Sequence, residues 1–269
     1  MTSASSIQAA LSDGLRALAR WLHNWWRILQ LGGELLALAL SPSTYGAAYR
    51  RALLRHIYFG AAPSLVWFAV LTTLLSLVVI RIVLVTSVSY GLTQYALEMV
   101  VRVLVLELIP LTAALFAALR CTIPQAAEVT VLRSRGQWAA DMRAGGDDPM
   151  RLEVLPRVSA GVVCALLLAA VSCGITLVLA YFAVYGFTSA GFPAYTRTVG
   201  HVFSPGIALV FALKILAMAL AVSLLPVASV LIEPVRSRTY TASAELRGLV
   251  RMFFAILLIE GAALVGNYY

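Results

Sequence analysis

The sequence predicts an all-α integral membrane protein, and three observations support that fold class. Of its 269 residues, 61% are hydrophobic and only 12% are charged. The mean hydropathy is +0.91. The apolar residues gather in five runs, each close to the roughly 20 residues that a helix needs to cross a bilayer. Because this much apolar surface exceeds what one soluble core could hide, we expect lipid to be the main solvent of the chain.

The first expected element is an amphipathic helix within residues 1–60, a region distinct from the membrane domain at 61–269. Between Leu15 and Leu29 apolar residues recur at helical spacing, while arginines fall on another face. Tryptophans in this stretch suit the headgroup level, and the arginines suit anionic lipid. The pattern predicts a helix lying in the membrane interface, and the alternative is a soluble helix packed on a partner. A Ser-Pro-Ser break at 41–43 follows it.

Five predicted spanning helices follow this region. They lie at about 61–88, 96–120, 158–184, 206–232 and 249–266. The last run is short and carries Glu260.

The distribution of basic residues predicts how these helices are oriented. Of twenty basic residues, six fall between Arg16 and Arg55, six between Arg120 and Arg157, and four between residues 236 and 251. Cytoplasmic loops carry such an excess, so we expect the N-terminus in the cytoplasm and the C-terminus on the periplasmic side. Since these residues punctuate apolar runs and form no basic stripe, the net charge of +8 does not indicate nucleic-acid binding.

Two ionisable residues lie deep inside the predicted spans. Glu107 is roughly 16 Å from the outer end of the second span, and Lys214 is roughly 12 Å into the fourth. A charge in hydrocarbon costs several kcal/mol unless it is paired or solvated. We therefore expect both side chains to face one polar cavity, as an ion pair or as contacts for a charged headgroup. The alternative is a pair that only fixes helix packing.

The motifs of membrane enzymes are missing from the sequence. There is no GxSxG, no HExxH, no cluster of aspartates for magnesium and no GxxxxGK[ST] phosphate loop. The histidines have no second ligand at metal-binding spacing within a span. We therefore expect no catalytic residues, no metal and no cofactor in this chain, with any ATP bound by a separate partner subunit.

Three segments between Glu107 and Val158 occur in the order typical of one family. They read ELIPLTAALFAALR, AAEVTVLRSRGQW and GGDDPMRLEVLPRV. This order resembles the signature of MlaE-type permeases, the membrane subunits of transporters that work with MCE-domain proteins. The matching residues are Glu107, Pro110, Arg120, Glu128, Arg133, Gln137, Asp148, Pro149, Arg151, Pro156 and Arg157. Ile109 and Gly136 differ from the family pattern, and the first span lacks the usual glycines, so any bend there needs another origin.

The resemblance implies a homodimeric lipid permease of the bacterial inner membrane. Its implied partners are an ABC ATPase subunit, a periplasmic MCE-domain protein, a small STAS-like cytoplasmic subunit and phospholipid. It also implies that the cytoplasmic segment 121–157 contains the coupling helix, at 125–148. The polar residues there that would contact an ATPase are Glu128, Arg133, Arg135, Gln137 and Arg143.

We therefore expect a permease that moves phospholipid between the inner membrane and a periplasmic MCE-protein conduit. The predicted cavity residues are Glu107, Lys214, Leu104, Leu111 and Phe211. Two alternatives stay open at this point. One is an ion-coupled carrier that acts alone, and the other is a membrane scaffold that does not transport.

Overall fold

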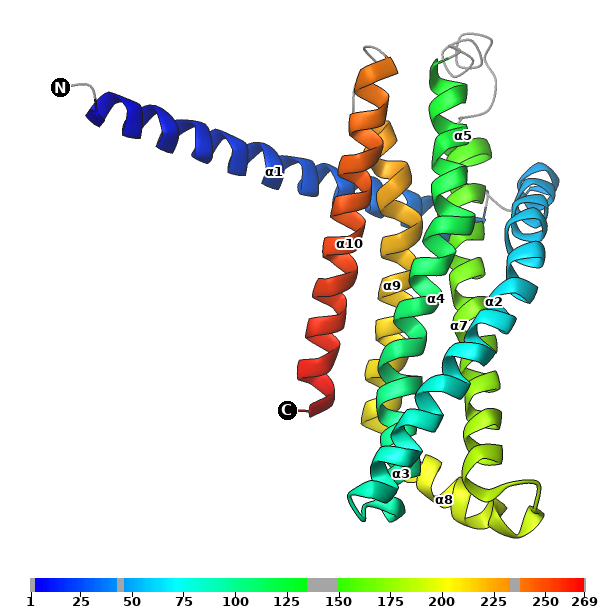
Figure 1. Cartoon of the computed structure of the whole chain (residues 1–269). Coiled ribbons are helices and arrows are strands. Elements are labelled where there is room, and N and C mark those ends of the chain that lie inside the picture. Colours follow the sequence, from blue (N-terminus) through cyan, green and yellow to red (C-terminus); the bar gives the residue numbers. More distant parts are fainter. Residues whose placement is uncertain (1–2, 43–45, 135–149, 233–237, 269) are drawn as a thin grey trace.

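The computed structural model describes residues 3–42, 46–134, 150–232 and 238–268, and within these ranges every regular element is helical. Figure 1 shows a bundle of long helices crossed near one end by the N-terminal helix. The longer elements are α1 (Ser3–Leu40), α2 (Ala47–Ser89), α7 (Leu155–Tyr185), α8 (Phe192–Val202), α9 (Pro205–Ile232) and α10 (Arg238–Tyr268). Between α2 and α7 the chain forms α3 (Ala96–Met99), η3 (Val100–Leu108), α4 (Ile109–Ala117), η4 (Ala118–Thr122) and α5 (Ile123–Ser134), and η5 (Met150–Val154) precedes α7.

Five helices in the described part of the chain are long and apolar enough to cross a membrane. They are Tyr49–Ser89, Ala96–Ser134, Met150–Tyr185, Pro205–Ile232 and Leu246–Asn267. The prediction of an all-α membrane fold with five spans is therefore confirmed. The run that carries Glu260 belongs to α10 and is long enough to count among them.

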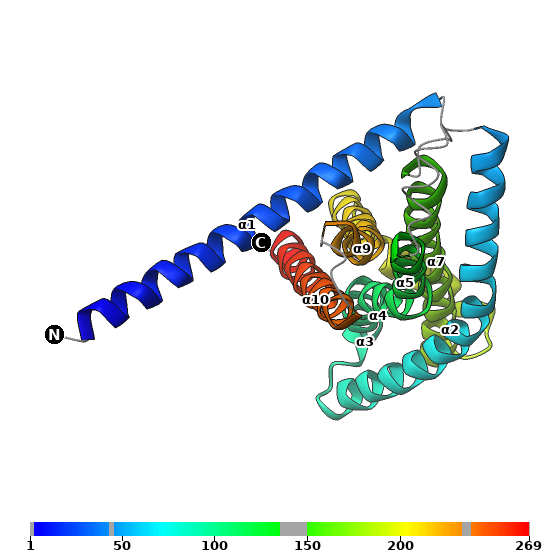
Figure 2. The ribbon, with the colours of Figure 1, turned by 90° about the horizontal axis from the view of Figure 1, so that it is seen from above.

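Helix α1 runs across the bundle, and its N-terminal part projects away from the other helices (Figure 2). Ile28 and Leu35 are buried where α1 contacts α9 and α7. At Gly32 an added Cβ would lie 2.9 Å from a methyl group of Leu224, so α1 and α9 approach closely there. Trp26 and Leu29 remain exposed on the other side. This two-sided pattern suits a helix that packs on the bundle with one face and meets lipid with the other.

Helix α2 changes direction along its length, which Figure 2 shows from above. Pro63 lies inside this helix, and a proline lacks the N–H that the carbonyl four residues earlier would accept. Proline thus gives a physical origin for a bend in this span, whose predicted part at 61–88 lacks glycines. Most of the outer surface of α2 carries exposed apolar side chains, as expected for lipid contact.

The second spanning helix is continuous from Ala96 to Ser134 and includes two π-helical stretches, η3 and η4. It therefore extends well past the end at residue 120 that hydropathy predicted. Pro124 does not stop it; this proline lies directly after the π-helical stretch η4, inside the continuous helix. The predicted residues Arg135, Gln137, Arg143, Asp148 and Pro149 lie outside the described residues.

The interior of the bundle is built around α7, which packs against α2, α4 and α9. Small residues such as Ala113, Ala117 and Ala165 let these helices approach closely. Ser76 of α2 and Thr176 of α7 share a buried hydrogen bond of 2.8 Å. Such a bond satisfies two polar groups that would otherwise face hydrocarbon.

Candidate substrate site in the membrane

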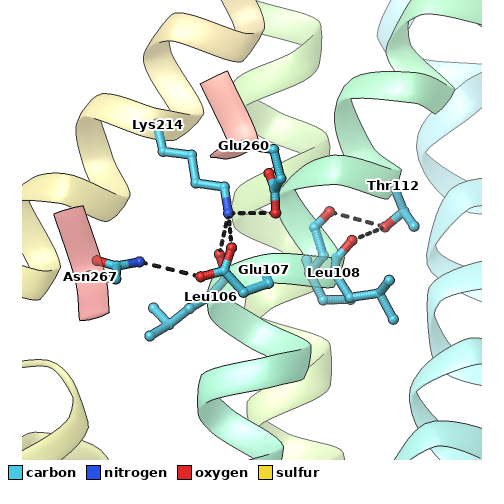
Figure 3. A network of polar contacts seen from close by, with 8 residues as sticks. Leu106, Glu107, Leu108, Thr112, Lys214, Glu260 and Asn267 are labelled. Carbon is cyan, nitrogen blue, oxygen red and sulfur yellow. Dashed lines mark hydrogen bonds and ion pairs between the residues drawn. The ribbon is translucent and has the colours of Figure 1, made fainter. Parts of the chain in front are cut away.

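Lys214 joins three helices through its ammonium group (Figure 3). Its side chain is fully buried, and its Nζ donates to Glu107 of η3 and to Glu260 Oε1 of α10, the latter at 2.9 Å. The third donor is used by the Leu106 carbonyl at 3.0 Å. An ammonium has three donors, so every one is satisfied. We call Glu107, Lys214, Glu260 and Asn267 the ion cluster.

Asn267 completes this cluster from the end of α10. Its Nδ2 donates to Glu107 Oε1 at 3.3 Å. The two carboxylates are each about 15% exposed, whereas Lys214 has no exposed side-chain surface. Because charges are this costly in hydrocarbon, mutual pairing explains how four polar residues are tolerated inside spanning helices.

The local helix geometry of the second span explains why the Leu106 carbonyl is free to accept a hydrogen bond from Lys214. Pro110 lies at the start of α4, directly after the π-helical stretch that holds Glu107. Proline has no N–H for the Leu106 carbonyl four residues earlier, and Lys214 donates to that oxygen instead. Thr112 similarly donates to the carbonyls of Leu108 and Ile109, both at 3.0 Å.

The structure brings together some of the predicted cavity residues and separates others. Glu107 and Lys214 form the expected ion pair. Leu104 is fully buried in a core cluster with Val100, Val101 and Ile109, and the partly buried Phe211 packs against that cluster, whereas Leu111 packs against a different one. Glu260 and Asn267 were not among the predicted site residues. The signal for Glu260 was present, because it is an ionisable residue within a predicted span.

The comparisons with known proteins agree with this architecture. The family model described as Permease MlaE matches residues 53–265, which is most of the chain. The chain belongs to the MlaE permease family. A comparison with curated proteins finds no match. The chain is therefore a multi-pass membrane permease of lipid transport, and a transport subunit rather than an enzyme.

A second polar site of this permease lies at the end of the bundle that holds α5. Arg157 of α7 is buried, and its Nε lies 3.5 Å from Glu128 Oε2 of α5. Its Nη1 also donates to the carboxylate of Glu153 and, at 2.7 Å, to the Glu153 carbonyl. Glu128 keeps 60% of its side-chain surface exposed. Arg157 thus ties α5 to α7 while leaving Glu128 open to a partner. We call these three residues the arginine latch.

The next turn of α5 is tied to α9. Arg133 Nη1 donates to the Val230 carbonyl at 2.5 Å, close to the C-terminal end of α9. A cation is favourable there because carbonyl groups in the last turn of a helix have no partner within the helix. Two residues that the sequence assigned to ATPase coupling, Glu128 and Arg133, therefore also hold α5 against its neighbours.

Two cavities open near these contacts. A polar cavity of about 410 Å³ lies beside the arginine latch and is also lined by Arg55 and His56 of α2. An apolar cavity of about 260 Å³ lies between α1, α7 and α9, where Leu35, Val162 and Leu224 contribute to its walls. The other predicted motif residues are less enclosed: Arg120 is exposed and Arg151 is half-buried, although Pro156 is buried.

Proposed function

We propose that this chain is the permease subunit of an ATP-driven phospholipid transporter. It would work as a homodimer in the inner membrane, between a cytoplasmic ABC ATPase and a periplasmic MCE-protein conduit, with a small STAS-like subunit on the cytoplasmic side. The ion cluster is the observation that carries the proposal. A spanning bundle with only a structural role gains little from burying four polar side chains where apolar residues would pack as well.

The arrangement of the cluster supports a role in binding an amphiphile. Glu107, Glu260 and Asn267 keep some exposed surface, whereas Lys214 has none. Leu111 and Phe211 provide partly buried apolar surface on neighbouring elements. Polar groups of a lipid would meet the cluster, and acyl chains would meet aliphatic and aromatic side chains. The apolar cavity beside α1 offers a second surface suited to acyl chains.

The arginine latch supports coupling to an ATPase. Helix α5 is continuous with the span that carries Glu107, so a push on its exposed end acts on the same helix as Glu107. Glu128 offers an exposed carboxylate, and Arg133 connects the same helix to α9, which carries Lys214. Motion of α5 would therefore reach Glu107, which lies on the same span, and Lys214, which lies on α9.

The test is reconstitution of the gently solubilised complex with its ATPase in vesicles. We expect lipid and an ATPase to copurify with the chain, and ATP-dependent lipid transfer to be lost in Glu107→Ala and in Lys214→Ala. Glu98→Ala is the matched control, because Glu98 forms an i,i+4 pair with Arg102 away from the cluster. Full transport in both cluster variants at normal expression would overturn the proposal.

The same assay separates the two alternatives. Transport that persists with an inactive ATPase would favour a carrier that acts alone. A well-folded chain that copurifies with neither lipid nor ATPase would favour a scaffold.

A further inference from the structure

The ion cluster has one negative charge more than its lysine can balance. Lys214 is the cation of the cluster, and it pairs with both Glu107 and Glu260. Among the described ion pairs, these two are the ones that involve Lys214. If both carboxyl groups were ionised, a buried site inside spanning helices would carry a net charge of −1. Such a charge is costly in hydrocarbon unless something neutralises it.

The hydrogen-bond pattern points to a missing donor rather than a missing acceptor. All three donors of Lys214 are used. Glu260 Oε2 and Asn267 Oδ1 are buried and have no hydrogen-bond partner. Both are acceptor atoms in the structure. The cluster therefore lacks a donor at the same place where it has an excess negative charge.

A proton suits these buried acceptor oxygens better than a larger cation does. The unpartnered oxygens have essentially no exposed surface, so a headgroup ammonium or a metal ion has no room to reach them. The carboxyl groups of Glu107 and Glu260 both pair with Lys214 Nζ, so they lie around one and the same ammonium group. Two carboxyl groups this close rarely ionise together, and a shared proton lowers the cost.

We propose that the ion cluster is a proton-binding site, in which Glu107 and Glu260 share one proton beside Lys214. The groups that face this proton are Lys214 from α9, Glu107 from η3 and Asn267 from the same helix as Glu260. With the proton bound, the cluster is neutral. Its release changes the charge of the cluster by one unit at the contact between α9, α10 and the second span. The inference concerns protonation and does not depend on lipid being the cargo.

Infrared spectroscopy of the purified full-length chain tests the proposal. A protonated carboxyl group gives a C=O stretching band that ionised carboxylates lack. We expect the wild-type chain at neutral pH to show this band, and Glu260→Gln and Glu107→Gln each to lose it, because one remaining carboxylate suffices to balance Lys214. Lys214→Met should keep the band, and Glu98→Gln, which alters the partly exposed pair with Arg102, should leave it unchanged.

Every outcome of this experiment is informative. A wild-type chain without the band overturns the proposal, and that measurement needs no variant to fold. A band that survives in both glutamine variants places the proton elsewhere and also overturns it. Loss in only one variant contradicts a shared proton. Because the band is read without any transport assay, failure here leaves the proposed lipid function standing, and failure of lipid transport leaves the proton site standing.

Discussion

Pro110 and Lys214 meet at one carbonyl group. The proline has no N–H for the Leu106 oxygen, and the lysine, which lies on a different spanning helix, donates to that oxygen at 3.0 Å. The hydrogen bond that one helix lacks is thus supplied by a side chain of another. The same lysine also holds Glu107 and Glu260, so this carbonyl fixes the position of the ammonium within the ion cluster.

Replacing Lys214 should destabilise the protein strongly. Lys214→Met leaves both glutamate side chains and the Leu106 carbonyl without their donor, and breaking a buried pair from one side costs about 3–5 kcal/mol. We expect a clear fall in the melting temperature of the solubilised chain. Arg102→Met is the control, since its pair with Glu98 is 30% exposed on both sides and is worth only about 0.3–0.5 kcal/mol.

A triple variant separates this structural cost from function. Glu107→Gln, Lys214→Met and Glu260→Gln together replace every ionisable side chain of the cluster, so much of the lost stability should return. Lipid transfer should nevertheless stay absent. Active transport in the triple variant would show that the charges serve only helix packing.

Pro110→Ala should weaken the site without unfolding the protein. Alanine supplies an N–H that competes with Lys214 for the Leu106 carbonyl, and alanine is the more favourable residue in a helix. A hydrogen bond to a charged group contributes about 1.5–3 kcal/mol, so partial loss predicts roughly a tenfold fall in lipid transfer. The melting temperature should stay the same or rise.

Pro226→Ala is the matched control for this change. Pro226 is also a buried proline inside a spanning helix, but it lies about 18 Å along α9 from Lys214. Its replacement should leave lipid transfer close to the wild-type rate. An equal loss in both variants would assign the effect to proline in general and not to the Leu106 carbonyl.

Hydropathy alone predicted the spans, because a membrane helix must satisfy its backbone internally and present apolar side chains to lipid. Depth along the helices also placed Glu107 and Lys214 at one level, as an ion pair or as contacts for a headgroup, and the structure shows an ion pair between them. The sequence could not show that Glu260 joins them, since that depends on how α10 packs against α9. The arginine latch could not be predicted either. Glu128 and Arg157 lie on two different helices, and no sequence pattern defines how those helices are rotated relative to each other.

The arginine latch makes a prediction about coupling. Arg157→Met removes the cation that joins α5 to α7, yet Glu128 and Glu153 are 60% and 44% exposed and can be hydrated afterwards. The stability cost should therefore be about 1–2 kcal/mol, less than for Lys214. Lipid transferred per ATP hydrolysed should fall several-fold, because motion of α5 is no longer passed to α7.

Two comparison variants accompany this measurement. Arg157→Lys keeps the charge but cannot form the same set of contacts, so it should give an intermediate ratio of lipid to ATP. Arg50→Met removes an exposed arginine of α2 and should change neither the ratio nor the stability. A wild-type ratio in Arg157→Met would exclude the latch from coupling.

Gly161 of α7 packs closely against two other elements. An added Cβ would lie 2.8 Å from Ser223 Oγ of α9 and 2.9 Å from Thr122 Cγ2 of η4. Gly174, on the same helix, has nothing within 4 Å of the equivalent position. We expect Gly161→Val to lower stability by about 1–3 kcal/mol relative to Gly174→Val, as overpacking of a close contact does.

The pair of valine variants isolates packing from helix propensity. Both substitutions replace glycine with valine inside α7, so their intrinsic effect on the helix is the same and cancels in the difference. Thermal unfolding in one detergent measures that difference. Adding Ser223→Ala should recover part of the loss in Gly161→Val, because it removes the closest atom, whereas it should do nothing for Gly174→Val. Equal melting temperatures for the two valine variants would mean that α7 and α9 can separate at Gly161 without cost.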